Sequence, residues 1–310
     1  MHNETVLEVV AVQQIADEVC AVDLVAPGSG KLLDWQPGAH ISVSLPVGRR
    51  QYSLCGPSDA EFYRIAVLRS PTSRGGSAYI HDEVRVGAQL QCSAPINRFP
   101  LVPAEKYLFI AGGIGITPIL AMLVAAEKAG ADWRLVYGGR TLATMAFLDE
   151  LSAYSNRVTV VPQDTEGHIE LDTYLGSVQS EMVYSCGPEP LLRAVQERAG
   201  AWAAEQLHFE RFEAASDLVT TRDDDLPFDV FCNKSNVTVP VVAEQTMLNA
   251  LLEAGLDVDS DCEEGTCGTC EITYLAGTAD HRDDLLLDSE RATLILPCVS
   301  RGRGVITVDL

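Results

Sequence analysis

Long apolar runs and basic charge are what this sequence has little of. No apolar stretch reaches 18 residues and no charged-then-apolar leader follows Met1, so we expect a cytoplasmic protein without a membrane span. Lys and Arg number 22 against 44 Asp and Glu, which gives a formal net charge of −22. Such a surface repels phosphate backbones and anionic lipids, and this excludes nucleic acid and membranes as partners.

Histidines and zinc-type cysteine pairs are also scarce. The six histidines form no two-His, one-carboxylate pattern of the kind that holds a catalytic non-haem iron. Two C-x2-C pairs, the usual mark of a structural zinc site, do not occur together. The chain therefore shows no site of its own for activating a substrate on iron.

Four cysteines near the C-terminus form the most specific motif. Three are spaced C-x4-C-x2-C and the fourth follows after 27 intervening residues: Cys262, Cys267, Cys270 and Cys298. Plant-type ferredoxins hold a [2Fe–2S] cluster with four thiolates at this spacing. Gly265 and Gly268 let the loop fold back so that backbone N–H groups can point at the sulfurs. We predict a one-electron iron–sulfur centre, with a zinc site or plain buried thiols as the alternative.

Three blocks emerge along the 310 residues. Residues 1–100 alternate short apolar runs with Pro and Gly, which predicts an antiparallel β-barrel. Residues 101–215 alternate apolar strands with helical stretches, which predicts a parallel-sheet α/β domain. Residues 216–225 are polar and aperiodic and are the candidate linker. Residues 226–310, with a strand pair, a helix and the cysteine motif, are the predicted ferredoxin domain of β-grasp type.

Acidic charge is concentrated in the block that contains the cysteines. Residues 226–310 hold 15 Asp and Glu against five Lys and Arg. This excess can serve solubility alone, or it can steer a basic protein partner toward the cluster.

A glycine-rich turn follows the apolar run 107–111 and precedes a helical stretch. Its residues are Gly112, Gly113, Gly115, Thr117 and Pro118. Glycines there let the backbone approach a pyrophosphate, and a helix N-terminus favours its negative charge. The alternative is a purely structural turn between strand and helix.

A second nucleotide signal is Cys186-Gly187-Pro188, at the end of a later predicted strand. Ligands of open α/β sheets lie at the carboxyl ends of the strands, so the Cys186 thiol can line a nicotinamide pocket. Taken alone, Cys186 also fits a buried core position. Arg140, after the second strand of this block, is a candidate contact for the 2′-phosphate of NADPH.

Hydride donors deliver electrons in pairs and a [2Fe–2S] centre accepts them singly, so a flavin is expected between the two. The segment Arg50-Gln51-Tyr52-Ser53-Leu54 supplies an Arg for a flavin phosphate, a Tyr to lie against the ring and a Ser to hydrogen-bond it. Arg74-Gly75-Gly76-Ser77 precedes a predicted helix over 77–83 and suits a terminal phosphate. Arg74 can instead be a solvated loop cation.

Over essentially its whole length the chain resembles the phthalate dioxygenase reductase type of the ferredoxin–NADP reductase superfamily, which includes vanillate O-demethylase reductase subunits. The motifs of that family are matched in order: Arg50-x-Tyr52-Ser53, Gly75-Gly76-Ser77, Gly112-Gly113-x-Gly115-x-Thr117-Pro118, Cys186-Gly187-Pro188 and the four cysteines. The resemblance implies an FMN-binding barrel, an NAD(H)-binding α/β domain and a C-terminal plant-type ferredoxin.

The resemblance also implies site residues and cofactors. FMN, rather than FAD, would contact Arg50, Tyr52 and Ser53, with the loop Gly75–Ser77 over its phosphate. NADH would lie near Gly113, Thr117 and Cys186. The candidate catalytic residues are Ser53, on the flavin side, and Cys186, on the nicotinamide side. Phe212, in Glu210-Arg211-Phe212, would cover the flavin, unless it is a core residue. One departure is that Pro95-Ile96-Asn97-Arg98-Phe99 lacks the Arg that the family shows before Asn97.

The expected function is electron transfer from NADH through FMN and the cluster to a separate terminal oxygenase. The resemblance points to a Rieske non-haem iron oxygenase, with a P450 as the alternative partner, and to a reductase that is a monomer. Two other hypotheses are a ferredoxin carrier without NADH chemistry, and a flavin reductase that does not need the cluster.

Overall fold

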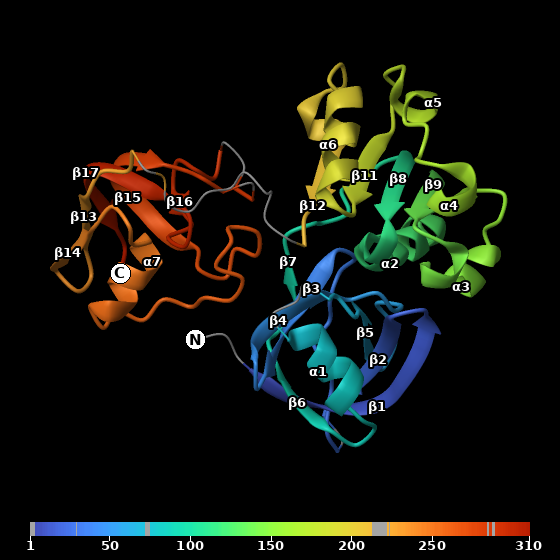
Figure 1. The fold of residues 1–310 in the computed structure, drawn as a ribbon, viewed down its shortest axis with the longest axis horizontal. Coiled ribbons are helices and arrows are strands. Elements are labelled where there is room, and N and C mark those ends of the chain that lie inside the picture. The colour runs from blue at the N-terminus through green and yellow to red at the C-terminus, as the bar shows by residue number, and fades with distance from the viewer. Residues whose placement is uncertain are drawn as a thin grey trace. The chain divides into compact units, whose positions relative to one another are not determined.

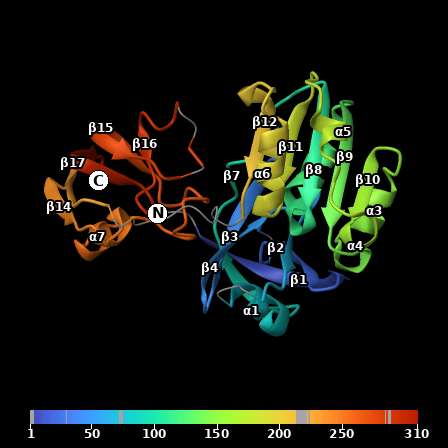
Figure 2. The ribbon, with the colours of Figure 1, turned by 45° about the horizontal axis from the view of Figure 1, so that its top comes forward.

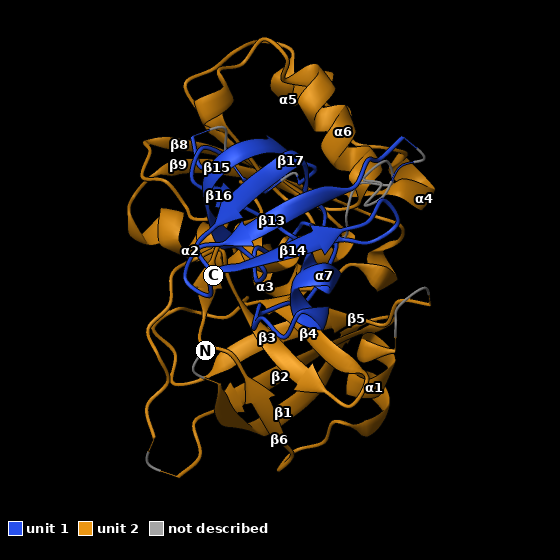
Figure 3. Cartoon of the chain, turned by 90° about the vertical axis from the view of Figure 1, so that its left-hand side faces the viewer, with its two compact units in different colours: residues 1, 213–310 blue, residues 2–212 orange. Residues whose placement is uncertain are grey.

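The computed structural model describes residues 4–28, 30–71, 75–212, 222, 224–283, 285–286 and 289–310. The chain divides into a larger unit, residues 2–212, and a smaller one, residues 213–310 with residue 1 (Figure 3). Arg74 and most of the predicted linker, residues 216–221 and 223, lie outside the described residues. No helix in the described part of the chain has the length and apolarity to cross a bilayer.

An antiparallel sheet of seven strands opens the larger unit. Its strands are β1 (Thr5–Ala16), β2 (Val19–Val25), β3 (Ala39–Leu45), β4 (Gly48–Ser53), β5 (Tyr63–Leu68), β6 (Gln89–Cys92) and β7 (Ile96–Asn97). The order is β4-β3-β6-β1-β2-β5, with β7 paired to β3. An antiparallel bridge between Leu54 and Ile65 joins the two ends of this order and closes the sheet into a barrel beside helix α1 (Gly76–Glu83) (Figure 1).

The barrel interior follows from the two-residue period of its strands. On β3, Ala39, Ile41, Val43 and Leu45 all belong to the barrel core, whereas the alternate residues His40, Ser42 and Ser44 do not. A one-residue slip of this strand would exchange the two sets, so burial of the apolar set fixes its register.

A second sheet has five strands, all parallel, in the order β10-β9-β8-β11-β12 (Figure 2). Its strands are β8 (Lys106–Gly112), β9 (Asp132–Gly139), β10 (Val158–Pro162), β11 (Met182–Cys186) and β12 (Leu207–Glu210). The helices between them are η1 (Gly113–Gly115), α2 (Ile116–Lys128), η2 (Leu142–Thr144), α3 (Leu148–Ser152), α4 (Gln163–Glu166), α5 (Asp172–Leu175), α6 (Glu189–Arg198) and η3 (Ala204–Gln206).

Both faces of this sheet are covered, which is why its strands read as continuous apolar runs. On β8, Tyr107 and Phe109 share an apolar cluster with α2, while Leu108 and Ile110 share another with α5 and α6. The first cluster also contains barrel residues, Val19 and Ala66 among them. The barrel and the parallel sheet of this unit are therefore joined by one apolar core.

The smaller unit is a mixed sheet with one helix. It contains β13 (Phe228–Cys232), β14 (Val237–Val241), α7 (Met247–Glu253), β15 (Ile272–Asp280), β16 (Leu294–Ile295) and β17 (Arg301–Val308), as Figure 3 shows. The strand order is β14-β13-β17-β15-β16, and β13 and β17 run parallel while the other pairs are antiparallel. Thr246 caps α7 by accepting the Asn249 N–H at 3.1 Å. The three sheets confirm the predicted fold class.

One buried tyrosine ties the parallel sheet to the chain that leaves the barrel. The hydroxyl of Tyr184 accepts the Val102 N–H at 2.7 Å and donates to the Pro100 carbonyl at 3.1 Å. Tyr184 is fully buried, so replacing it by Phe removes both bonds without opening a large cavity. We expect Tyr184→Phe to lower the free energy of unfolding of the larger unit by about 1–2 kcal/mol, as measured in urea.

The matched control is Tyr79→Phe, on a half-buried tyrosine packed against the barrel core. Its effect should be smaller. Equal destabilisation by the two variants would show that the Tyr184 bonds contribute no more than the hydroxyl of a half-buried tyrosine does.

Candidate flavin, nucleotide and iron–sulfur sites

Two strand-ending turns meet at the carboxyl edge of the parallel sheet. A Cβ atom placed on Gly115 would lie 2.3 Å from the Cys186 carbonyl oxygen, and one placed on Gly187 would lie 3.0 Å from Gly112 Cα. Only glycine permits this approach. The sequence motifs after β8 and β11, predicted separately, are thus brought together at one place.

The helix that leaves the first turn presents its N-terminus at the same edge. Gly113 has φ of +53°, a left-handed conformation that favours glycine, and Gly115 precedes the first residue of α2. Thr117 and Pro118 are buried in the first turn of α2, and the Thr117 hydroxyl donates to the Ile114 carbonyl at 3.0 Å. The Ile116 N–H donates to the Gly113 carbonyl and Pro118 has no N–H, so what α2 offers an anionic pyrophosphate is mainly the positive end of its helix dipole.

Cys186 lies beside a carboxyl group that the sequence analysis did not single out. It ends β11, is fully buried, and its Sγ lies 4.0 Å from Oε2 of Glu210, the residue next to it across the parallel pairing with β12. Burial raises the pKa of Glu210 to about 8 and also raises that of Cys186. Near neutral pH the edge therefore bears an uncharged thiol and carboxyl pair. In the sequence, the available signal for Glu210 was a glutamate that directly follows Leu207-His208-Phe209.

Phe212 and Arg140 lie at more open positions. Phe212 is 42% exposed, so its side chain is not part of a core and is available to cover a ligand. Arg140 follows β9 and is exposed, and its carbonyl accepts the Asp164 N–H at 3.1 Å.

Arg50 and the glycine loop before α1 are in close contact. A Cβ atom on Gly76 would lie 2.6 Å from Arg50 Cγ, so the arginine crosses the start of the helix. The Arg50 guanidinium also donates to the Val47 carbonyl at 3.1 Å. Gly75, with φ of +89°, caps the helix in a left-handed conformation. This cradle of a guanidinium and helix-starting amides fits the flavin phosphate.

The other predicted flavin residues differ in burial and in the groups that they contact. Tyr52 is half-buried on β4, and Ser53, the last residue of that strand, is buried opposite His40. Leu54 points into the barrel core and its N–H donates to the Ala39 carbonyl at 2.8 Å. Ser77 is buried, and its hydroxyl accepts the Ser70 N–H at 3.2 Å.

Asn97 has a structural role that the sequence left open. Its side-chain amide donates to the Pro37 carbonyl at 3.0 Å, and its side-chain oxygen accepts the Phe99 N–H at 3.0 Å. Gly38 is packed so closely that a Cβ atom there would lie 1.8 Å from the Phe99 carbonyl oxygen. Asn97 therefore closes the end of the barrel at this point.

The four predicted cluster ligands lie in two pairs. Sγ of Cys270 and Sγ of Cys298 are 3.2 Å apart, and Cys262 and Cys267 are joined by a side-chain hydrogen bond. That bond, more than any other cause, lowers the pKa of Cys262. In the described part of the chain no three His, Cys, Asp or Glu side chains converge on a single ion. Two thiolates for each of two irons is the arrangement that a [2Fe–2S] cluster needs.

The cysteine loop also has the backbone that such a cluster requires. Gly265 and Gly268 both have φ of +73°. The Glu264 N–H points to Cys262 Sγ at 3.3 Å, and the Thr269 N–H points to Cys267 Sγ at 3.4 Å. Amide donors to sulfur stabilise negative charge on the thiolates. The residues present fit the iron–sulfur centre.

Known protein families match two parts of the chain. Residues 230–302 match the family model described as 2Fe-2S iron-sulfur cluster binding domain, and residues 109–197 match the one described as oxidoreductase NAD-binding domain. These spans contain the cysteine loop and both nucleotide turns. Vanillate O-demethylase oxidoreductase of Pseudomonas putida is 38% identical over 94% of this chain and 95% of its own length.

Solved structures extend the match to the whole fold. Phthalate dioxygenase reductase, a modular structure for electron transfer from pyridine nucleotides to [2Fe–2S], has a TM-score of 0.73 and 33% identity over 99% of this chain and 98% of its own. The chain belongs to the phthalate dioxygenase reductase family. This reductase is therefore an NADH-dependent flavin iron–sulfur oxidoreductase, with FMN, NADH and a [2Fe–2S] cluster as its cofactors.

The same reductase architecture occurs inside a longer protein. An intact type IV self-sufficient cytochrome P450 monooxygenase matches with a TM-score of 0.93 and 40% identity over 99% of this chain. The reductase covers only 41% of that P450 chain.

The raised pKa of Glu210, a half-buried residue, makes stability depend on pH. Its pKa is about 8 in the folded reductase against an ordinary value of 4.5, so between these values the unfolded chain releases a proton that the folded chain keeps. The free energy of unfolding of the larger unit should therefore fall as pH rises through this window. Glu210→Gln should remove that part of the fall, as measured by urea unfolding at several pH values.

Glu205→Gln, on the exposed helix η3 just before β12, is the matched control. Its pH profile should follow that of the unmodified reductase. A Glu210→Gln profile with the same slope as the control would show that Glu210 is ionised in the folded state.

Proposed function

We propose that this reductase is the electron-supplying component of a multicomponent oxygenase, and that it passes electrons from NADH to a separate Rieske-type terminal oxygenase. The observation that carries the proposal is the presence in one chain of a nucleotide edge, a phosphate cradle on a barrel and a two-plus-two cysteine loop. FMN held in the phosphate cradle would supply two-electron acceptance with one-electron release, and a cluster held by the four cysteines would supply single-electron transfer.

The protein residues have separate tasks in this proposal. Gly112, Gly113 and Gly115 let the NADH pyrophosphate approach the N-terminus of α2. Cys186 lies at the carboxyl edge where the nicotinamide is expected, and the uncharged Glu210 beside it keeps the edge free of negative charge. Because NADH has no 2′-phosphate, Arg140 has no such group to bind.

The flavin half is assigned on the same basis. Arg50 and the amides of Gly75, Gly76 and Ser77 hold the phosphate of FMN. Tyr52 and Ser53 contact the ring, with Phe212 covering it. The predicted contacts of Leu54 are limited to its backbone, because its side chain lies in the barrel core.

A second candidate partner is a P450. The match to an intact type IV self-sufficient cytochrome P450 monooxygenase favours it, since that protein contains a similar reductase module. The two candidates are separated by reconstitution. The purified reductase, NADH and either a Rieske oxygenase or a P450 are combined, and NADH-dependent product formation is measured. If no product forms with the Rieske oxygenase and none forms with the P450, the role as an oxygenase reductase is contradicted.

Replacing one cluster ligand separates the flavin step from the cluster step. We expect Cys267→Ser to keep NADH–ferricyanide activity, which the flavin half supports, and to lose NADH–cytochrome c activity, which needs single-electron transfer from the cluster. Cys232→Ser changes a buried thiol of the same unit outside the loop and should keep both activities. Full cytochrome c activity in Cys267→Ser would favour a flavin reductase that works without the cluster.

The excess of Asp and Glu within residues 226–310 predicts that the rate of turnover with the partner oxygenase depends on salt. If their charge steers docking, the rate with the oxygenase should fall as ionic strength rises, because the Debye length shrinks to about 8 Å at physiological salt. A neutral solute at equal osmolality is the control. A rate that does not change with salt rules out steering.

A further inference from the structure

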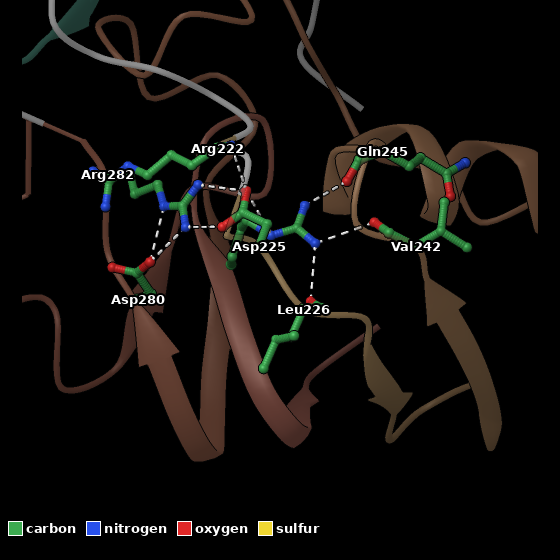
Figure 4. A network of polar contacts seen from close by, with 8 residues as sticks. Arg222, Asp225, Leu226, Val242, Gln245, Asp280 and Arg282 are labelled. Atoms are coloured by element: carbon green, nitrogen blue, oxygen red, sulfur yellow. Dashed lines mark hydrogen bonds and ion pairs between the residues drawn. The ribbon is translucent and has the colours of Figure 1, made fainter.

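A buried ion network lies at the start of the smaller unit. The Asp225 carboxylate precedes β13 and its side chain is only 5% exposed. One oxygen, Oδ2, accepts the Arg222 N–H at 2.7 Å and an Arg282 N–H at 3.0 Å, and Oδ1 is also bonded to Arg282 (Figure 4). The hydrogen bonds from Arg282, more than any other cause, lower the pKa of Asp225 to about 2, so the group is an anion at all physiological pH values.

Arg282 connects this carboxylate to the end of β15. Its guanidinium is 5% exposed and also donates to Asp280 Oδ2 at 2.9 Å. Asp280 is the last residue of β15 and its side chain is 43% exposed. The bidentate Asp225 bond is thus the buried half of the Arg282 environment, and the Asp280 bond is the solvated half.

Arg301 connects the same carboxylate to the start of β17. Its Nε lies 3.4 Å from Asp225 Oδ2, and its side chain is 3% exposed. The remaining N–H groups donate to the carbonyls of Gln245 at 2.7 Å, Val242 at 3.1 Å and Leu226 at 3.3 Å. One carboxylate therefore lies between two guanidinium groups, and both are almost completely removed from water.

Both arginines are close in the chain to the walls of the cysteine loop. Asp283, next to Arg282, lies against Gly265, where an added Cβ atom would be 3.5 Å from Asp283 Cβ. Val299 lies against the same glycine, with its Cγ2 2.8 Å from that added atom, and it is two residues before Arg301. Gly265 is within the loop between Cys262 and Cys267.

The energetics argue that the network does more than stabilise the fold. Burying a charge pair costs several kcal/mol per ion, and apolar side chains of equal volume stabilise a fold as well or better. Removing one partner, by contrast, leaves an uncompensated buried charge. A network of this kind is best suited to fixing a particular arrangement of the elements that it joins.

We propose that Asp225 is a positioning residue for the iron–sulfur centre. By holding Arg282 and Arg301 together, it fixes the two chain segments that pack on Gly265, and it balances the positive charge of both arginines near the cluster loop. The proposal rests on the assignment of Cys262, Cys267, Cys270 and Cys298 as cluster ligands.

The test is Asp225→Asn in the full-length reductase. Loss of one negative charge leaves the positive charge of the two guanidinium groups less balanced, which favours the added electron. We expect the midpoint potential of the cluster to rise, the EPR spectrum of the reduced cluster to change, and cluster loss to a chelator to become faster. Adding Arg282→Gln restores the charge balance and should return the potential toward that of the unmodified reductase.

Asp309→Asn is the matched control, because it removes the same charge from the same unit at the more exposed Lys234 pair. It should leave potential, EPR spectrum and cluster loss unchanged. The proposal is overturned if Asp225→Asn equals Asp309→Asn in all three. Where Asp225→Asn contains no cluster, recovery of the cluster in the double variant supports the proposal, and a cluster-free double variant overturns it. An unmodified reductase without iron and sulfide would instead contradict the cysteine assignment and the proposed function.

Discussion

The nucleotide half of this reductase depends on the contact between two backbone turns. Gly115 and Gly187 let the chain after β8 pass against the chain after β11 at distances that no side chain would allow. That contact places the N-terminus of α2, the Cys186 thiol and the Glu210 carboxyl along one edge. A bulkier residue in either turn would separate groups that must act on the same cofactor.

Charge is handled differently in the two units. At the nucleotide edge the carboxyl of the half-buried Glu210 avoids the cost of desolvation by staying protonated. In the smaller unit Asp225 stays ionised because Arg282 and Arg301 surround it. Desolvation alone favours the neutral acid at Glu210, and paired cations favour the anion at Asp225, so the two carboxyl groups differ in charge.

Much of the fold could be predicted from the sequence because local patterns determined it. The apolar run 107–111 lies within β8 (Lys106–Gly112), and the helical stretch predicted after the glycine-rich turn is α2 (Ile116–Lys128). Strand β17, which begins Arg-Gly-Arg-Gly, has no such pattern and is a strand because β13 and β15 pair with it. Strand β15 was not predicted either. Its pairing with β17 has register shifts on either side of Ala276, and its sequence shows no regular alternation of apolar and polar residues.

The sites show the same limit. Motif spacing identified the cysteines, but their division into two pairs depends on the folded loop. Asp225 reads as part of a polar linker because Arg282, its partner, is 57 residues away. The partner of Glu210, Cys186, is 24 residues away on another strand.

The winding of the parallel sheet has a wider consequence. The chain runs outward from β8 through β9 to β10, then returns past β8 to β11, so α2 and α6 leave on opposite faces. The binding edge lies between β8 and β11, where the direction of winding reverses, and this position is set by the strand order. Side-chain replacement can thus change which dinucleotide is preferred, whereas the location of the binding edge is inherited with the strand order.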